Sequence, residues 1–433
     1  MAYGERSRSA AALVVSIVLT LLIVLPVSDA YARYKPKPKR HFLSWESLKR
    51  PEEYKKLKRH TLSDRRFDIS KRRVVKLKKN SFMNFRPYQF TTPTIIGDKM
   101  FIGVDAGYFY GINARLKEKI WTFRTEGAVQ GAAATDGNTV YATDCKGYIY
   151  ALDANYGKEK WKSLLDTSIM SKPLIDGDRL YVVTMSGRLY TLDRNTGIEI
   201  WHTNSHERNF GFSVRRSATP TIRNGLIYVG TSSGTIIAYH MSNGSVAWVR
   251  QIGDRREQLY DVDGTPIFIG DSLYVTTADG RLSCLNASTG RVLWYVDAGG
   301  SNDPLYYDGK LYVTGGGTLS CLDPHSGHIY WQQDLDEPGL SSPAAGDNYI
   351  AVASTTDRLF LIDSNTGDVA FERYIRKGSF GDPVVIGDLL YILSNSGRMF
   401  TFKVRELKKR TKSNIAKKAD SQQAEEVAED ENQ

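Results

Sequence analysis

The sequence predicts an all-β fold, an eight-bladed β-propeller made of four-stranded antiparallel blades. Three observations support this prediction. A unit of about forty residues repeats along the chain, apolar and polar residues alternate within short runs, and Gly-containing turns separate four such runs in each unit. The composition agrees, because 25 tyrosines and 37 glycines but only 14 prolines suit many short strands joined by tight turns.

The N-terminal region, residues 1–32, is predicted to be a signal peptide or an uncleaved signal anchor. Two arginines precede an apolar run over residues 10–25, and the Ala-Tyr-Ala sequence at 30–32 is a small-residue site for cleavage after Ala32. The run is long for a signal peptide and close to the lower limit for a spanning helix, so an anchor stays an alternative. Either outcome places the folded part in the cell envelope.

Residues 33–71 are predicted to be a basic linker. Between Arg33 and Lys79 the chain has 19 Lys and Arg but only 5 Asp and Glu, and such a segment does not bury enough surface to fold alone. It is either a solvated linker or a tether, through residues 33–79, to an anionic membrane or cell-wall surface. The net charge of +10 is concentrated here. The rest of the chain is mildly acidic, which argues against nucleic acid as a partner.

The predicted propeller spans residues 72–404, and its clearest repeats are LYVVTMSGRLYTLDRNTGIEIW at 180–201 and LYVTTADGRLSCLNASTGRVLW at 273–294. The first turn of the unit occurs eight times, at Gly97-Asp98, Asp136-Gly137, Asp176-Gly177, Asn224-Gly225, Gly270-Asp271, Asp308-Gly309, Gly346-Asp347 and Gly387-Asp388. The closing aromatic occurs seven times, as Trp121, Trp161, Trp201, Trp248, Trp294, Trp331 and Phe371. The eighth unit therefore lacks its fourth strand.

The missing strand is expected to come from the N-terminal side, because a completed last blade leaves no open gap in the ring. The stretch from Arg72 to Lys78 resembles a strand, and we expect residues near Val74 to pair with the strand from Met399 to Val404. Residues 405–433 change from basic to acidic and are predicted to be a charged disordered tail.

Several recurring residues are best explained by structure. The closing tryptophans are expected to pack between neighbouring blades, and Cys284 and Cys321, at one repeat position, are expected to be buried and unbridged. Four Leu-Asp aspartates are expected to cap turns, namely Asp153, Asp193, Asp323 and Asp363. We predict no catalytic, cofactor-binding or metal-binding residues, because the three cysteines are far apart and no HExxH, GxSxG or GxxxxGK[ST] motif occurs.

Two long intervals interrupt the repeat. The spacings after Trp201 and Trp248 are 47 and 46 residues, whereas three of the other four are 40. The first interval contains FSVRRSATP at 212–220 and the second contains YDVDGTP at 260–266. The unit resembles the PQQ-like repeat of quinoprotein dehydrogenases. These two segments are similar to the leucine-x-leucine-arginine and DVDTTP segments that precede blades four and five in the BamB family of outer-membrane protein assembly factors.

The resemblance implies a non-enzymatic periplasmic scaffold that supports outer-membrane β-barrel assembly by binding the POTRA region of a BamA-like subunit through the loops of blades 3–5. Carried over by residue, Phe212 and Val214 are apolar anchors, Arg215 is the basic contact, and Asp261 and Asp263 are acidic partners. In the alternative, Arg215 and Asp263 only brace their loops. Unfolded outer-membrane proteins are a further expected partner, through pairing with strand edges.

Two other functions stay open at this point: a propeller that binds cell-wall or surface polymer through its basic arm, and a PQQ-dependent dehydrogenase. The chain lacks the adjacent cysteines and the calcium-ligand cluster of those dehydrogenases. It also lacks a lipobox cysteine near the apolar run. The expected location is therefore periplasmic, either associated with the outer membrane or tethered to the inner membrane by an uncleaved N-terminal helix.

Overall fold

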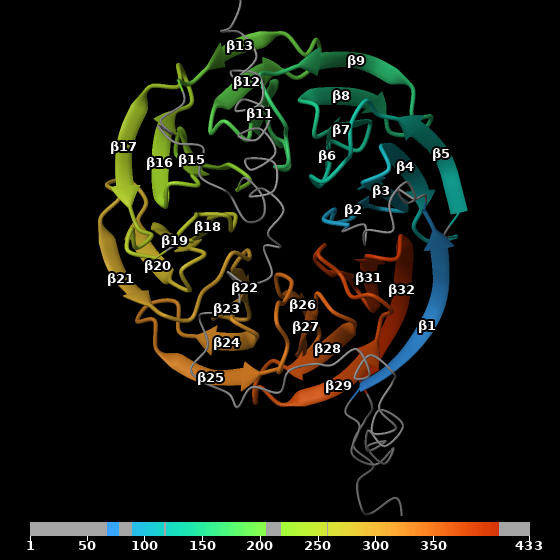
Figure 1. Cartoon of the computed structure of the whole chain (residues 1–433), viewed down its shortest axis with the longest axis vertical. Helices are drawn as coiled ribbons and strands as arrows, with labels where there is room; N and C mark the ends of the chain where they lie inside the picture. Colours follow the sequence, from blue (N-terminus) through green and yellow to red (C-terminus); the bar gives the residue numbers. More distant parts are fainter. Residues whose placement is uncertain (1–66, 78–88, 117, 205–217, 258, 407–433) are drawn as a thin grey trace, which may run out of the picture. The chain divides into compact units, whose positions relative to one another are not determined.

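The computed structural model describes residues 67–77, 89–116, 118–204, 218–257 and 259–406. The chain divides into two compact units, residues 1–63 and residues 64–433, and the first lies wholly outside the described residues. The second contains eight antiparallel sheets of four strands each, arranged as blades around an axis (Figure 1). The predicted eight-bladed β-propeller is therefore confirmed. Within the described residues, no helix is long and apolar enough to cross a membrane.

The first four blades follow one another in the sequence. Blade 1 contains β2 (Thr94–Ile96), β3 (Lys99–Val104), β4 (Tyr108–Asn113) and β5 (Glu118–Arg124). Blade 2 contains β6 (Ala134–Thr135), β7 (Thr139–Thr143), β8 (Tyr148–Asp153) and β9 (Glu159–Leu164). Blade 3 contains β10 (Leu174–Asp176), β11 (Arg179–Val183), β12 (Leu189–Asp193) and β13 (Glu199–His202). Blade 4 contains β14 (Thr221–Arg223), β15 (Leu226–Gly230), β16 (Thr235–His240) and β17 (Val246–Gln251).

The next three blades repeat this order, and the eighth does not. Blade 5 contains β18 (Ile267–Ile269), β19 (Ser272–Thr276), β20 (Leu282–Asn286) and β21 (Val292–Val296). Blade 6 contains β22 (Leu305–Tyr307), β23 (Lys310–Gly315), β24 (Thr318–Leu322) and β25 (Ile329–Asp334). Blade 7 contains β26 (Ala344–Gly346), β27 (Tyr349–Ala353), β28 (Arg358–Asp363) and β29 (Val369–Tyr374). Blade 8 contains β30 (Val384–Ile386), β31 (Leu389–Ser394), β32 (Arg398–Glu406) and β1 (Phe67–Lys76).

The ring closes where the N-terminal strand β1 joins blade 8. β1 pairs antiparallel with β32, with Val74 opposite Phe400 and Val75 opposite Met399, as predicted. The strand begins at Phe67, before the expected start at Arg72. Phe67 is fully buried, and its ring lies edge-on to that of Tyr349 in blade 7, with the ring centroids 5.3 Å apart. Closure therefore combines backbone pairing with packing against the preceding blade.

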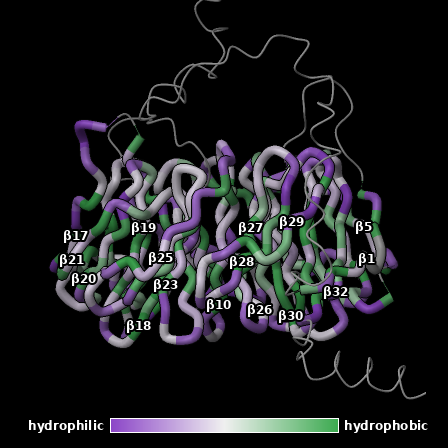
Figure 2. The backbone as a smooth tube through the Cα atoms, turned by 90° about the horizontal axis from the view of Figure 1, so that it is seen from below, coloured by the Kyte–Doolittle hydropathy of each residue, from purple (hydrophilic) through white to green (hydrophobic). Residues whose placement is uncertain are grey.

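The hydrophobic core lies between neighbouring blades, because the second and third strands of each blade are buried on both faces and contribute to shared clusters. Figure 2 shows the ring edge-on, with hydrophobic stretches along the strands and hydrophilic stretches at the loops. Each closing tryptophan packs against the glycine in the turn between the third and fourth strands of the next blade. The pairs are Trp121–Gly157, Trp161–Gly197, Trp201–Gly244, Trp248–Gly290, Trp294–Gly327 and Trp331–Gly367. The predicted interblade position of the tryptophans is confirmed.

The turn aspartates and the repeat cysteines also have the predicted roles. Asp323 Oδ1 accepts hydrogen bonds from the backbone N–H groups of His325, at 2.9 Å, and Ser326, at 2.7 Å. Asp153, Asp193 and Asp363 cap their turns in the same way. Cys284 and Cys321 are buried free thiols on β20 and β24 of adjacent blades.

Candidate functional site

The loops that connect successive blades lie on one face of the ring, which we call the loop face. These interblade loops are residues 125–133, 165–173, 203–220, 252–266, 297–304, 335–343 and 375–383. Those that the structure describes form hydrogen bonds with the turns between the second and third strands. For example, the Cys145 N–H of such a turn donates to the Ala128 carbonyl at 2.9 Å, and the Thr355 N–H donates to the Gly339 carbonyl at 3.0 Å. Such backbone bonds fix the positions of these two loops.

The two longest interblade loops are those between blades 3 and 4 and between blades 4 and 5. In the first, residues 205–217 lie outside the described residues, and with them lie Phe212, Val214 and Arg215. The second, residues 252–266, is described except for residue 258. The proposed contacts of Phe212, Val214 and Arg215 therefore stay predictions.

The second loop is clamped between two blades. The Val262 N–H donates to the Thr231 carbonyl of blade 4 at 3.0 Å, and the Ala278 N–H of blade 5 donates to the Asp261 carbonyl at 2.9 Å. In this position Asp261 is only 4% exposed to solvent and Asp263 only 7%. Both aspartates that the sequence singled out thus lie below the surface, and a role for them in contacting a partner stays a prediction.

The exposed part of this loop is a charged segment that the sequence analysis did not single out. The Asp254 N–H donates to Asp279 Oδ2 at 2.7 Å, and the Arg256 Nη2 atom lies 2.6 Å from Asp254 Oδ2. The hydrogen bond from Arg256 holds the pKa of Asp254 below its usual value. The Arg256 side chain is 88% exposed. The sequence signal was the Asp-Arg-Arg-Glu run at 254–257, inside an interval longer than the repeat.

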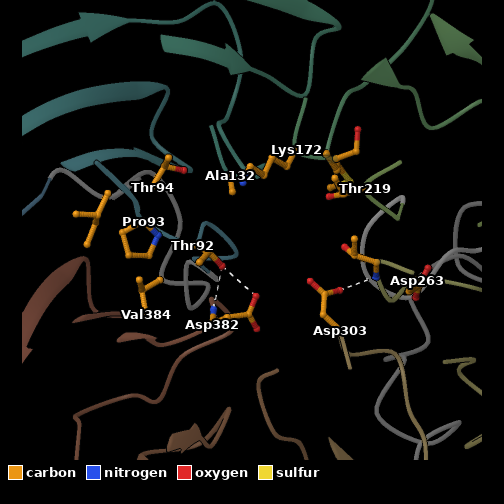
Figure 3. A pocket seen from close by; sticks show the side chains of 14 residues that line it. Thr92, Pro93, Thr94, Ala132, Lys172, Thr219, Asp263, Asp303, Asp382 and Val384 are labelled. Atoms are coloured by element: carbon orange, nitrogen blue, oxygen red, sulfur yellow. Dashed lines mark hydrogen bonds between the residues drawn. The ribbon is translucent and has the colours of Figure 1, made fainter. Parts of the chain in front are cut away.

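A cavity of about 350 Å³ lies where the interblade loops enter the first strands of the blades. Among its described lining residues, Lys172 is the single cation, and Asp263, Asp303 and Asp382 are the carboxylates. Figure 3 shows Lys172 across the cavity from Asp303 and Asp382. Surrounding protein lowers the pKa of Lys172 by desolvation, although its side chain reaches water, and nearby Asp303 opposes that shift.

A belt of interblade hydrogen bonds lines part of this cavity. The Thr265 N–H donates to Asp303 Oδ1 at 2.6 Å, and the Asp303 N–H donates to Ser342 Oγ at 3.1 Å. The Ser342 N–H donates to Asp382 Oδ1 at 2.9 Å, and the Asp382 N–H donates to Thr92 Oγ1 at 3.1 Å. In each bond, a backbone N–H group at the entry to one blade donates to a side-chain oxygen at the entry to the next blade. The belt therefore joins blades 5, 6, 7, 8 and 1.

The belt residues share a sequence signal. Each of the five is followed by a proline that directly precedes the first strand of its blade, and proline favours an extended conformation for the residue before it. At the equivalent positions of blades 2 and 3 stand Ala132, which has no side-chain acceptor, and Lys172, whose ammonium group only donates. Their side chains therefore cannot accept a backbone N–H as the side chains of the belt do.

The described histidines and cysteines across the ring are the further candidates for metal ligands or nucleophiles. Within the described residues, no group of three or more His, Cys, Asp or Glu side chains is placed to hold a metal ion. His202 Nδ1 lies 2.7 Å from Glu199 Oε1, so this histidine forms a side-chain hydrogen bond with a glutamate of its own strand. Burial raises the pKa of Cys321 to about 11, so its thiolate is scarce at neutral pH.

The sequence of this chain is similar to a known protein family and to individual members of it. A family model described as "Outer membrane protein assembly factor BamB" matches residues 106–315 and 315–423. A protein of that description from Legionella pneumophila (strain Paris) is 25% identical over 193 residues, which are 43% of this chain and 50% of the relative. One from Shewanella oneidensis is 26% identical over 195 residues, which are 43% of this chain and 49% of the relative. The chain thus matches about half the length of these relatives.

Solved structures share the fold. The crystal structure of BamB from Moraxella catarrhalis is similar with a TM-score of 0.67 and 23% identity, over 78% of this chain and 100% of that one. A europium-containing methanol dehydrogenase is similar with a TM-score of 0.64 and 14% identity, over 77% of this chain and 93% of that one. At these identities the likeness concerns the fold alone, which serves more than one function.

Proposed function

This chain belongs to the family of the outer membrane protein assembly factor BamB, and from that premise we propose that it is a non-enzymatic scaffold for outer-membrane β-barrel assembly. Its proposed location is the periplasmic side of the cell envelope. There, residues 1–32 would act as a signal peptide or anchor, and residues 33–79 would act as a basic linker or tether. The predicted partner is the POTRA region of a BamA-like subunit.

The observation that carries the proposal is the pair of long interblade loops next to each other on blades 3–5. One of them is clamped between blades 4 and 5 and carries the exposed Arg256 with its partner Asp254. A charged group in a fixed position favours specific association, because little conformational entropy is lost on binding. The neighbouring loop would supply Phe212 and Val214 as apolar anchors and Arg215 as a second basic contact.

The cavity lining supports a role without a quinone cofactor. Pyrroloquinoline quinone carries three carboxylates, and here it would face Asp263, Asp303 and Asp382 with only Lys172 to balance them. Like charges at close range cost free energy in a partly desolvated site. The described residues therefore do not fit this cofactor.

A binding measurement tests the proposed docking surface. The purified full chain would be titrated with the POTRA region of the BamA-like subunit from the same organism. We expect Arg256→Glu to weaken binding by about tenfold or more, because the reversed charge would repel the groups of the partner that Arg256 would contact. Arg215→Glu tests the predicted contact in the neighbouring loop and is expected to have an effect of the same direction.

Arg115→Glu is the matched control. Arg115 is also an exposed arginine beside an aspartate, with Nε 3.3 Å from Asp98 Oδ1. It lies in the turn between β4 and β5, at the opposite ends of the strands from the interblade loops. We expect this variant to bind like the wild type. Failure of the wild-type chain to bind, or equal loss in Arg256→Glu and Arg115→Glu, would contradict the proposal.

A further inference from the structure

The fourth strand of each blade has a neighbour on one side only, so its outer edge faces away from the sheet. The outer strands are β5, β9, β13, β17, β21, β25, β29 and β1 (Figure 1). An outer strand presents backbone N–H and C=O groups that are able to pair with another strand. Proteins commonly protect such edges with charged side chains, especially lysine.

Among these outer strands, β21 is the one without such protection. Its sequence, Val-Leu-Trp-Tyr-Val, has no Asp, Glu, Lys or Arg. β1 has five such residues, β5 and β9 have three each, and β29 has two. β13, β17 and β25 have one each. The edge of blade 5 is therefore the least protected against strand addition in the described part of the ring.

Three of the five side chains of β21 are also exposed and largely apolar. Val292 is 37% exposed, Leu293 is 44% exposed and Tyr295 is 61% exposed. The guanidinium of Arg281 lies over the Tyr295 ring, 4.7 Å from its centroid, as in a cation–π contact. In a soluble protein, clustered exposed apolar side chains often mark a contact surface. Here they flank an available backbone edge.

We infer that the edge of β21 binds an extended strand in which apolar and polar residues alternate, the pattern found in transmembrane β-barrel strands. The backbone would pair with β21, and alternate apolar side chains would contact Leu293 and Tyr295. This inference rests on the proposed function, because unfolded outer-membrane proteins are the segments of this chemistry that an assembly scaffold would meet. It adds a second surface, on the outer rim of blade 5, to the docking surface on the loop face.

The size of the edge indicates which occupant it fits. Five residues of strand extend for roughly 17 Å, whereas a stable interface between folded proteins uses about 20–30 residues on each side. β21 is thus too short to hold a second folded copy of the chain by itself. It suits one peptide segment bound weakly and reversibly, as the handling of a client requires.

Peptide binding tests the inference directly. The full chain would be titrated with a fluorescent ten-residue peptide of alternating apolar and polar residues, with fluorescence anisotropy as the readout. An isomer with its apolar residues grouped together, and a version N-methylated on alternate residues, complete the set. We expect the two altered peptides to bind about tenfold more weakly or worse, because one loses the alternating pattern and the other loses backbone pairing. Equal binding of the N-methylated peptide overturns the inference.

Leu293→Lys and Ile120→Lys form a matched pair of variants. Each residue immediately precedes the closing tryptophan of its blade, and Ile120, 51% exposed, lies on the charged strand β5. We expect Leu293→Lys to weaken binding of the alternating peptide about tenfold and Ile120→Lys to change it less than twofold. Equal effects overturn the inference. It is also overturned if sedimentation shows a dimer that Leu293→Lys dissociates, because the edge then serves a second copy.

The two proposals fail separately. Leu293→Lys is expected to retain binding to the POTRA region of the BamA-like subunit, because β21 lies on the outer rim and not on the loop face. Loss of specific peptide binding with retained POTRA binding would overturn only the edge inference. Loss of POTRA binding with retained peptide binding would overturn only the docking surface on the loop face.

Discussion

A tryptophan and a glycine from the next blade form the contact that repeats most regularly in this molecule. Trp294 packs against Gly327, whose φ is +74°, and a Cβ at Gly327 would lie 2.8 Å from Trp294 Cε3. Glycine is required there for two reasons, the left-handed backbone and the space taken by the indole ring. The repeat preserves this pair in six consecutive blades, and it sets how closely they approach.

Two alanine variants separate these reasons. Gly309 has a φ of +72°, and a Cβ there would meet no atom within 4 Å. We expect Gly309→Ala to cost about 1–2 kcal/mol from backbone strain alone. Gly327→Ala is expected to cost about 1–3 kcal/mol more because of the indole contact. Urea unfolding midpoints measure the difference, and equal destabilisation by the two variants would show that the contact has no energetic role.

The turn aspartates predict a pH dependence. Hydrogen bonds from the Ser326 N–H and hydroxyl lower the pKa of Asp323 to about 2, from an ordinary value of 3.8. Because this pKa is lower in the folded than in the unfolded protein, the ionised carboxylate stabilises the fold above about pH 4. This stabilisation is lost as the pH falls toward about 2. We expect Asp323→Ala to cost at most about 1 kcal/mol near pH 7, because the carboxylate is only half-buried and water screens it. Thermal unfolding of both proteins from pH 7 to 2 tests this. A difference that stays constant with pH contradicts it.

Among the elements, the interblade loops combine structural and functional roles. The loop over residues 252–266 is fixed by backbone bonds to Thr231 and Ala278, in different blades, and it holds Asp254 and Arg256 at the surface. The belt around the cavity uses the last residues of such loops to join blades 5, 6, 7, 8 and 1. The loop face is therefore rigid where the loops meet the strands, and its exposed parts are presented on that support.

The belt predicts a cost for removing one acceptor. Asp382 Oδ1 accepts the Ser342 N–H at 2.9 Å, and Asp382 Oδ2 accepts the Thr92 hydroxyl at 3.0 Å. We expect Asp382→Ala to destabilise the protein by about 1–3 kcal/mol, because the nearly buried Ser342 N–H loses its partner. Asp382→Asn keeps the Oδ1 acceptor and is expected to cost less. Chemical unfolding compares the two, and an equal cost for both would argue against the belt.

For the whole molecule, closure of the ring depends on β1. This strand is far in sequence from its partner β32, so the last blade depends on pairing between the two ends of the propeller segment. The pairing leaves no gap between blades 7, 8 and 1. The contact of Phe67 with Tyr349 adds side-chain packing to it.

A substitution in β1 tests the importance of closure. We expect Phe67→Ala to cost about 3–5 kcal/mol, because a fully buried aromatic ring is removed from the core between blades 7 and 8. Asp68→Ala, at the adjacent exposed position, is expected to change stability by about 0.5 kcal/mol or less. Denaturant unfolding of both variants provides the measurement. A small effect of Phe67→Ala would mean that the ring is stable without packing at this junction.

The repeat and its closure were predictable because turn glycines and closing tryptophans recur at a nearly constant spacing. The candidate site was predictable only in part. Burial of Asp261 and Asp263 depends on contacts with blades 4 and 5 that the local sequence does not reveal. The proline after Asp303 and Asp382 marked a repeat position, but the hydrogen-bond partner of each comes from a neighbouring blade and depends on how the blades pack.

The central claim is that the loop face of blades 3–5 contacts a BamA-like subunit. The most direct test is photocrosslinking in cells, with a photoreactive residue placed at Arg256 on the loop face or at Arg115 on the opposite face. We expect mass spectrometry to identify the BamA-like subunit in adducts from position 256 and not from position 115. Absence of this subunit from the adducts at 256, or equal recovery from both positions, would contradict the account.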